Sequence, residues 1–109
     1  MRTLAADHPD YVGRYEGEPD VRDAAYHQGT VWPWPIGGYV DAMLAVHGGS
    51  ADVKARCREA LLPLIESLDD AGIGQISEVY DGDAPHRPSG TVAQAWSVAE
   101  VLRAWMRVR

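Results

Sequence analysis

Apolar residues recur at helical spacing in the middle of this sequence. One such segment runs from about residue 33 or 35 to 47, and a second runs from a cap at Ser50 to about Leu68. Side chains three and four positions apart share one face of a helix, so each segment is predicted to be a helix with one buried stripe. Pro63 lies inside the second helix and is expected to bend or shorten it. The stripes are Ile36, Tyr39, Val40, Met43 and Leu44, and then Val53, Cys57, Leu61, Leu64, Ile65 and Leu68.

A third helix is predicted from Thr91 to near the C-terminus, because Thr91 and Gln94 have the spacing of a capping box. Its apolar residues cover most of its circumference, and they are Val92, Ala95, Trp96, Val98, Ala99, Val101, Leu102, Trp105 and Met106. Its polar stripe is narrow and consists of Ser97, Glu100, Arg103 and Arg107. A helix of this kind must be covered on several sides, which two partner helices can hardly achieve. We therefore expect the chain to be part of a larger helical assembly.

Two long segments lack sustained periodicity. Residues 1–30 are rich in Asp, Gly, Pro, Arg and Tyr, and residues 69–90 contain six Gly and Pro residues. Both are predicted to be loops, and a loop as long as the first usually either carries function or belongs to a larger body. The expected fold class is therefore all-α, with about three main helices and long functional loops.

Composition narrows the classes of partner. The chain has four Trp, five Tyr and no Phe, and Trp and Tyr combine a flat apolar face with a hydrogen-bonding edge. Its net charge is −6 and Lys54 is its only lysine, which argues against nucleic acid and against anionic membrane surfaces. No apolar run is long enough to span a bilayer. The only cysteine, Cys57, allows no internal disulfide, and we expect a buried thiol in a cytoplasmic protein.

The segment YHQGTVWPW (26–34) is the first candidate for chemistry. It places imidazole, amide, hydroxyl and indole groups together at the start of a predicted helix. Polar hydrogen-bonding groups beside flat aromatic faces suit a sugar, since a pyranose has polar hydroxyls and apolar ring faces. The alternative is a capped helix start in which Trp32 and Trp34 belong to the core. From the residues alone both interpretations stay open.

Glu78, in the second long loop, is the best single catalytic candidate. It lies between apolar Ile76 and Val79, where a carboxylate can be oriented and partly desolvated. A general base needs both a firm position and an ionised state at working pH. The alternative is an ordinary exposed loop acid.

Other chemistries find little support in the same loop. Asp81 and Asp83 flank a glycine as in a calcium loop, but the remaining calcium ligands are missing. No pair of histidines has zinc spacing. Ser77, His86 and Asp83 have the residue types of a hydrolase triad, but no nucleophile elbow accompanies them. We therefore expect neither a metal nor a cofactor.

Three segments in this order resemble the end of the amylo-α-1,6-glucosidase domain of glycogen debranching enzymes. They are YHQGTVWPW (26–34), SEVYDGDAPHRPSG (77–90) and QAWSVAEVLRAW (94–105). The similarity covers nearly the whole chain, including RTLA (2–5) and RDAAYHQG (22–29). The last two long segments are also similar to a region of glucoamylases, in which a Ser-Glu-x-Tyr-Asp sequence precedes a helix that begins near a Trp-Ser pair.

The resemblance implies a fold and a reaction. The fold is an (α/α) toroid of six helical hairpins, of which residues 1–109 would form the incomplete C-terminal part. The reaction is hydrolysis of α-1,6-linked glucose at glycogen branch points with inversion, using two carboxyl groups about 6.5–9.5 Å apart. Glu78 would be the general base. The general acid lies upstream in the family, so the isolated chain is expected to be inactive.

The resemblance also implies binding residues and partners. The residues that it places in the glucose pocket are His27, Gln28, Trp32, Tyr80 and Asp81. Asp81 and His86 have an alternative role as braces of their loop. The expected partners are glycogen or branched α-glucan oligosaccharides and the remainder of the toroid. The isolated chain is expected to self-associate or to fold poorly, because its third helix is apolar on too many sides.

Two other classes of function remain open. One is a non-catalytic helical module that binds glycans or assists assembly, with the aromatic surface but without the chemistry. The other is a helical scaffold that packs on a partner through Trp96, Trp105 and Met106.

Overall fold

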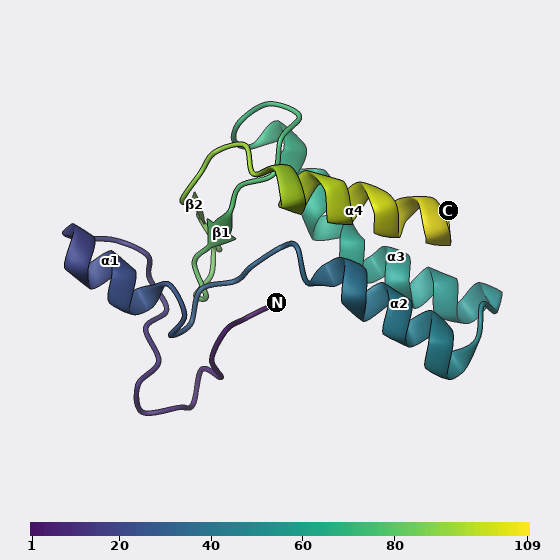
Figure 1. The fold of residues 1–109 in the computed structure, drawn as a ribbon, viewed down its shortest axis with the longest axis horizontal. Coiled ribbons are helices and arrows are strands. Elements are labelled where there is room, and N and C mark those ends of the chain that lie inside the picture. Colours follow the sequence, from purple (N-terminus) through teal and green to yellow (C-terminus); the bar gives the residue numbers. More distant parts are fainter.

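The computed structural model describes residues 1–109 as an all-α fold with one very small sheet. The elements in order are α1 (Pro19–Ala25), α2 (Ile36–His47), α3 (Ala51–Glu66), the 3₁₀ turn η1 (Ser67–Asp69), β1 (Val79–Tyr80), β2 (Pro88–Ser89) and α4 (Ala95–Val108). In Figure 1, α2, α3 and α4 lie together on one side, and α1 with the N-terminal arm lies on the other. None of these helices has the length and apolar character needed to cross a bilayer.

The predicted helices α2 and α3 are confirmed, with ends that follow local signals. Helix α2 begins directly after Pro35 and stops at Gly48, whose φ of 76° a side chain rarely allows. The Ser50 hydroxyl caps α3 by accepting a hydrogen bond from the Val53 amide at 3.4 Å. Helix α3 ends at Glu66, three residues after Pro63, so it is shorter than the pattern predicted.

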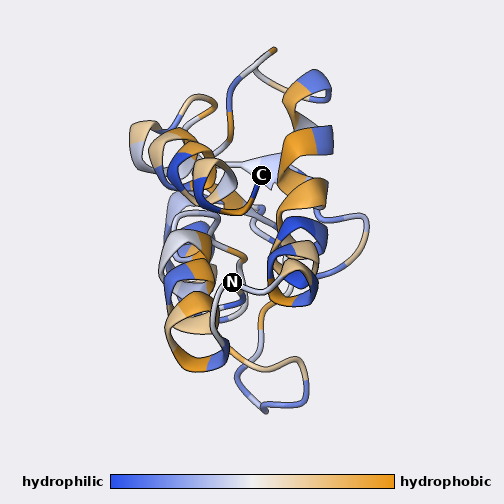
Figure 2. Ribbon diagram, turned by 90° about the vertical axis from the view of Figure 1, so that its right-hand side faces the viewer, coloured by the Kyte–Doolittle hydropathy of each residue, from blue (hydrophilic) through white to orange (hydrophobic).

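The core lies where α2, α3 and α4 meet under β1. Its buried members are Val40, Val53, Cys57, Leu61, Ile76, Tyr80, Val101, Ala104 and Val108. Figure 2 shows hydrophobic and hydrophilic residues alternating along the helices, as expected when each packs through one side. The predicted stripes of α2 and α3 face this core, with one exception. Tyr39 is 36% exposed, because no element covers its side of α2.

The predicted capping box of α4 is wrong. The helix begins at Ala95, and Gln94 is its N-cap without a side-chain cap bond. Residues 91–94 are tied instead to the loop before β1: the Thr91 amide donates to the Glu78 carboxylate, and the Gln94 amide donates to the carbonyl of Ile76. The predicted polar stripe is also wrong at Ser97, which is fully buried with an unpaired hydroxyl.

The excess apolar surface predicted for α4 is confirmed. Trp96, Leu102 and Met106 are between 48% and 58% exposed, although Val101, Ala104 and Val108 on the same helix are buried. The two partner helices therefore cover only one side of α4.

Three short elements were not predicted: α1 and the antiparallel strands β1 and β2. Helix α1 has only seven residues, too few to show a period, but Pro19 and Asp20 in its first turn are typical of a helix start. In the sheet Val79 pairs with Ser89 and Tyr80 pairs with Pro88. Strands of two residues are too short for an alternating pattern.

Candidate active site

The two loop segments singled out from the sequence meet through their backbones. Val31 and Tyr80 exchange two hydrogen bonds, each 2.8 Å long, so the segment before α2 runs against β1. At Gly82 a Cβ atom would overlap the carbonyl oxygen of Gly29. Glycine at position 82 therefore permits the close approach of the two loops.

The segment after α1 folds into a closed turn around the carbonyl of Tyr26. This oxygen accepts hydrogen bonds from the Thr30 hydroxyl at 2.6 Å and from the Trp32 indole nitrogen at 3.1 Å. The turn requires Gly29, which has a φ of 151° and leaves no room for a side chain beside the Val12 carbonyl. Tyr26 and Trp32 are thereby held in fixed relative positions.

Aromatic side chains form a continuous cluster next to this turn. His27 stacks on Trp32 with 5.4 Å between ring centroids and 6° between planes, and the Tyr26 ring meets Trp32 edge-on at 4.7 Å. On the other side Trp96 lies 6.2 Å from Trp32 and 5.7 Å from Trp34. Trp32 is 7% exposed, whereas Trp34 and Trp96 are 42% and 48% exposed. The core interpretation therefore holds for Trp32 but not for Trp34.

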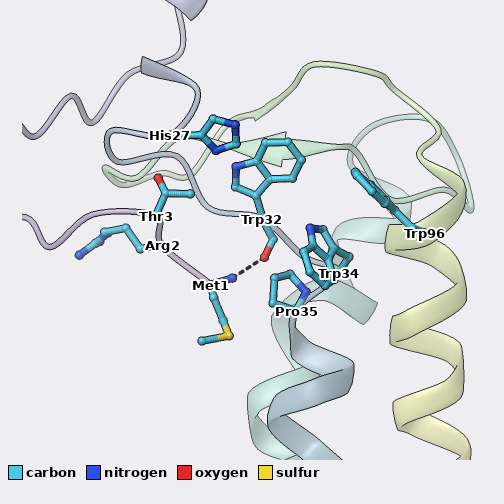
Figure 3. A pocket seen from close by; sticks show the side chains of 8 residues that line it. All are labelled: Met1, Arg2, Thr3, His27, Trp32, Trp34, Pro35 and Trp96. Carbon is cyan, nitrogen blue, oxygen red and sulfur yellow. Dashed lines mark hydrogen bonds between the residues drawn. The ribbon is translucent and has the colours of Figure 1, made fainter. Parts of the chain in front are cut away.

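The exposed side of this cluster forms a cleft of about 430 Å³ (Figure 3). Its lining residues are Met1, Arg2, Thr3, His27, Trp32, Trp34, Pro35 and Trp96. A volume of this size is within the range of small-molecule sites. Figure 3 shows the three indoles on one wall and the N-terminal residues opposite, with the Met1 amino group bonded to the Trp32 carbonyl.

Glu78 is held by donors from two other segments. One carboxylate oxygen, Oε1, accepts a hydrogen bond from the Tyr26 hydroxyl, and Oε2 accepts one from the Thr91 amide at 3.1 Å. Burial raises the pKa of Glu78, but the hydrogen bonds from Tyr26, Thr91 and Gln94 outweigh it and hold that pKa below its usual value. Glu78 is thus an oriented, ionised and partly exposed carboxylate, rather than an ordinary loop acid.

Tyr26 connects Glu78 to the aromatic cleft. Glu78 is not among the residues that line the cleft. The Tyr26 hydroxyl bonds to Glu78, while the Tyr26 ring packs against Trp32, one of the cleft walls. Burial and the bond to Glu78 raise the pKa of Tyr26, so its hydroxyl stays protonated and remains a donor.

Asp81 has the surroundings of a structural brace. Its side chain is 1% exposed and accepts hydrogen bonds from the Tyr15 amide at 2.9 Å, from Arg87 at 2.9 Å and from Arg14 at 3.3 Å. Burial raises the pKa of Asp81, but these three donors hold it below its usual value. His86 bonds to the carbonyl of Asp81 at 2.9 Å. Both side chains therefore stabilise the loop that follows β1.

Two further predicted pocket residues lie away from the cleft. Tyr80 is almost fully buried, with its hydroxyl 3.2 Å from that of Ser67, and it lines a second groove of about 680 Å³ beside α3. Gln28 has an exposed side chain, and its backbone carbonyl accepts a hydrogen bond from Val12 at 2.7 Å. Of the residues predicted to bind sugar, the structure places only His27 and Trp32 in the cleft.

Trp34 and Trp96 line the cleft, although neither was among the residues predicted to bind glucose. Trp34 belongs to the first motif, and Trp96 lies on the helix predicted to have uncovered apolar surface. The aromatic motif and the uncovered helix face could each be recognised in the sequence. The stacking of Trp34 on Trp96 could not, because it joins two distant segments through the packing of α4.

The acidic residues after β1 are engaged with protein groups. Asp83 accepts a hydrogen bond from the Tyr11 hydroxyl at 2.9 Å and lies 3.8 Å from Arg14, which also pairs with Asp81. No three His, Cys, Asp or Glu side chains are grouped as metal ligands.

Comparison with known protein families gives one match over nearly the whole chain. The family model described as amylo-alpha-1,6-glucosidase matches residues 1–103. No solved structure matches the chain.

Proposed function

The chain belongs to the amylo-α-1,6-glucosidase family, and on this basis we propose that it supplies part of the active site of an inverting glycogen-debranching hydrolase. The observation that carries the catalytic part of this proposal is the state of Glu78. The Tyr26 hydroxyl and the Thr91 amide orient its carboxylate, hydrogen bonds from Tyr26, Thr91 and Gln94 keep it ionised, and part of it stays open to solvent. A general base that activates water needs these properties.

In the proposed reaction Glu78 acts on water. The carboxylate takes a proton from the water molecule as its oxygen attacks the anomeric carbon of an α-1,6-linked glucose. The bond from that carbon to the branch-point oxygen breaks, and a carboxylic acid outside this chain protonates the leaving oxygen. Attack from the opposite face inverts the centre and releases β-glucose, with the two carboxyl groups about 6.5–9.5 Å apart.

We place glucan contacts in the aromatic cleft. The exposed indoles of Trp34 and Trp96 offer flat faces to the apolar side of a glucose ring, and His27 offers a hydrogen-bonding edge. Trp32 also lines the cleft, but it is largely buried and stacks on His27. Gln28 lies outside the cleft with an exposed side chain, and its contact with glucan stays a prediction. For Tyr80 and Asp81 the surroundings favour a role in shaping the loop that carries Glu78.

The larger body completes the site in this proposal. The exposed side of α4, with Trp96, Leu102 and Met106, is the face on which the remaining helical hairpins of a toroid pack. These hairpins also bring the general acid. The isolated chain is therefore expected to hydrolyse nothing measurable, because catalysis depends on positioning both carboxyl groups.

The experiment that tests this function follows the stereochemistry of the product. The full-length natural protein that carries this sequence is mixed with a dextrin bearing a single α-1,6-linked glucose, and the anomeric protons are followed by NMR. Release of β-glucose before mutarotation is expected. Initial release of α-glucose would contradict inversion, and absence of glucose release would contradict the hydrolase assignment.

A non-catalytic glycan-binding module is the second candidate. It is favoured by the lining of the cleft, which is aromatic and contains no acidic residue. A module of this kind would bind maltooligosaccharides in calorimetry, and Trp34→Ala would abolish the binding. The full-length protein would then hydrolyse no α-glucan.

A further inference from the structure

We propose that Tyr26 is a positioning residue for Glu78, whose carboxylate its hydroxyl holds in the orientation needed to receive a proton from water. The inference deepens the proposed function and rests on it for the catalytic consequence. The hydrogen bond from Tyr26, at the end of α1, to Glu78, directly before β1, is independent of the proposed function.

The carboxylate of Glu78 has two anchors. The Tyr26 hydroxyl donates to Oε1 and the Thr91 amide donates to Oε2, from segments on either side of Glu78 in the sequence. Rotation of the carboxylate would break at least one of these bonds. Glu78 remains partly exposed, so a water molecule can reach its carboxylate beside these anchors.

Tyr26 is itself fixed before it meets Glu78. Its carbonyl accepts the two hydrogen bonds from Thr30 and Trp32 described above, which hold its backbone. Its ring packs against Trp32, His27 and Tyr15 at centroid distances of 4.7, 5.1 and 5.5 Å. The hydroxyl is therefore presented by a preorganised side chain, which is the condition for effective positioning.

The charges around this pair are few. Tyr26 is the titratable group that faces Glu78, and the other donors to Glu78 come from Thr91 and Gln94. Tyr15 and Asp23 act on the Tyr26 phenol from the N-terminal arm and from α1. Because the hydroxyl bond lowers the pKa of Glu78, removing it must move that pKa upward.

The first test measures the link directly in the chain. The carboxyl carbon of Glu78 is followed by NMR during a pH titration of the wild type, of Tyr26→Phe and of Tyr15→Phe. Tyr15 has a neighbouring ring but no hydrogen bond to Glu78, so it is the matched control. The titration midpoint of Glu78 is expected to rise in Tyr26→Phe and to stay unchanged in Tyr15→Phe. An unchanged midpoint in Tyr26→Phe would overturn the inference.

The second test measures the catalytic consequence in the full-length natural protein. Tyr26→Phe is expected to lower kcat roughly tenfold with little change in KM, as for one lost charge-assisted hydrogen bond. The acidic limb of its kcat/KM profile moves to higher pH, because a base with a higher pKa loses its ionised form earlier. Wild-type kcat and an unmoved limb would overturn the positioning role.

Two further results separate the possible failures. If Glu78→Gln keeps wild-type turnover, the proposed function fails, while the NMR titration still decides whether Tyr26 holds Glu78. If Tyr26→Phe does not fold, the interaction between Tyr26 and Glu78 is measured through the pKa of Tyr26 instead. Removal of the negative charge in Glu78→Gln should lower the pKa of Tyr26, followed at its ring carbon Cζ, and an unchanged value would overturn the inference.

Discussion

Glu78 and Asp81 lie three positions apart, yet their carboxylates have very different surroundings. Glu78 is partly exposed and is held by a hydroxyl and a backbone amide, both uncharged. Asp81 is almost completely buried and is held by two guanidinium groups and an amide. A water molecule can reach Glu78 but finds no free access to Asp81. At the scale of single residues, only Glu78 has the surroundings of a base.

Asp81→Asn is expected to reduce the free energy of unfolding by about 1–3 kcal/mol at neutral pH, because it removes the buried carboxylate that Arg14 and Arg87 share. The remaining partners of these two arginines, Asp83 and Glu16, are largely exposed and compensate only in part. The folded-state pKa of Asp81 lies below its unfolded value of 3.8. Its stabilisation is therefore fully present above pH 3.8 and is lost as the pH falls through the folded-state pKa.

Urea unfolding at pH 7 and in strong acid checks this prediction, with Asp7→Asn, an exposed aspartate, as the control. The difference between the wild type and Asp81→Asn should narrow in acid. An equal difference at both pH values would contradict the role assigned to the carboxylate.

The sequence supported the choice of Glu78 but not the identification of its partner. An acid between apolar neighbours is a local pattern that can be read directly. The bond from Tyr26 joins residues 52 positions apart, and no local spacing encodes it. The close approach of Gly90 to Glu78 is likewise not encoded by any local spacing, although a Cβ at position 90 would come within 2.7 Å of the Glu78 carboxylate. Partners of this kind follow from tertiary structure alone.

At the scale of elements, local signals determined how well each helix was predicted. Helices α2 and α3 combine a clear period with a proline or serine at the start, and both were found. The start of α4 was misplaced because Thr91 has the right residue type for a cap but serves Glu78 instead. Tertiary hydrogen bonds there override a local preference, which single-sequence reasoning does not anticipate.

Two adjacent glycines in α2 give a prediction on helix packing. A Cβ at Gly38 meets nothing within 4 Å, whereas one at Gly37 would overlap the Glu100 carboxylate and come within 2.7 Å of Arg103 on α4. Gly38→Ala is expected to raise the free energy of unfolding by about 0.5–1 kcal/mol through helix propensity. Gly37→Ala should lose this gain because it displaces the Glu100–Arg103 pair.

Thermal unfolding of the two variants under identical conditions compares them. Both substitutions replace glycine by alanine and reduce the entropy of the unfolded chain by the same amount. A difference in stability between the two variants therefore reports the contact of position 37 with α4. Equal stability of the two variants would show that α2 and α4 do not approach as closely as described.

At the scale of the whole molecule, the chain has a covered side and an uncovered side. The core is built by α2, α3, α4 and β1, and the outer side of α4 remains apolar and exposed. The sequence predicted this asymmetry because the apolar residues of α4 exceed what two helices can bury. It did not predict that the N-terminal arm would pair with the segment around Val31, which itself pairs with β1, and close one wall of the cleft.

The exposed side of α4 is expected to drive self-association of the isolated chain. Sedimentation should show species larger than a monomer. The double change Leu102→Gln and Met106→Gln should shift them toward the monomer, since both side chains are about half exposed. A sharp monomer with a fully cooperative melt in the unmodified chain would argue against this expectation.

The most direct measurement of the central claim is the turnover of Glu78→Gln in the full-length natural protein on an α-1,6-branched dextrin. Its control is Glu59→Gln, which makes the same change at an exposed position of α3. Glu78→Gln is expected to lower kcat by about 10²–10⁴-fold, the usual contribution of a general base, while glucan binding and the control remain close to wild type. Wild-type turnover in Glu78→Gln would contradict the account.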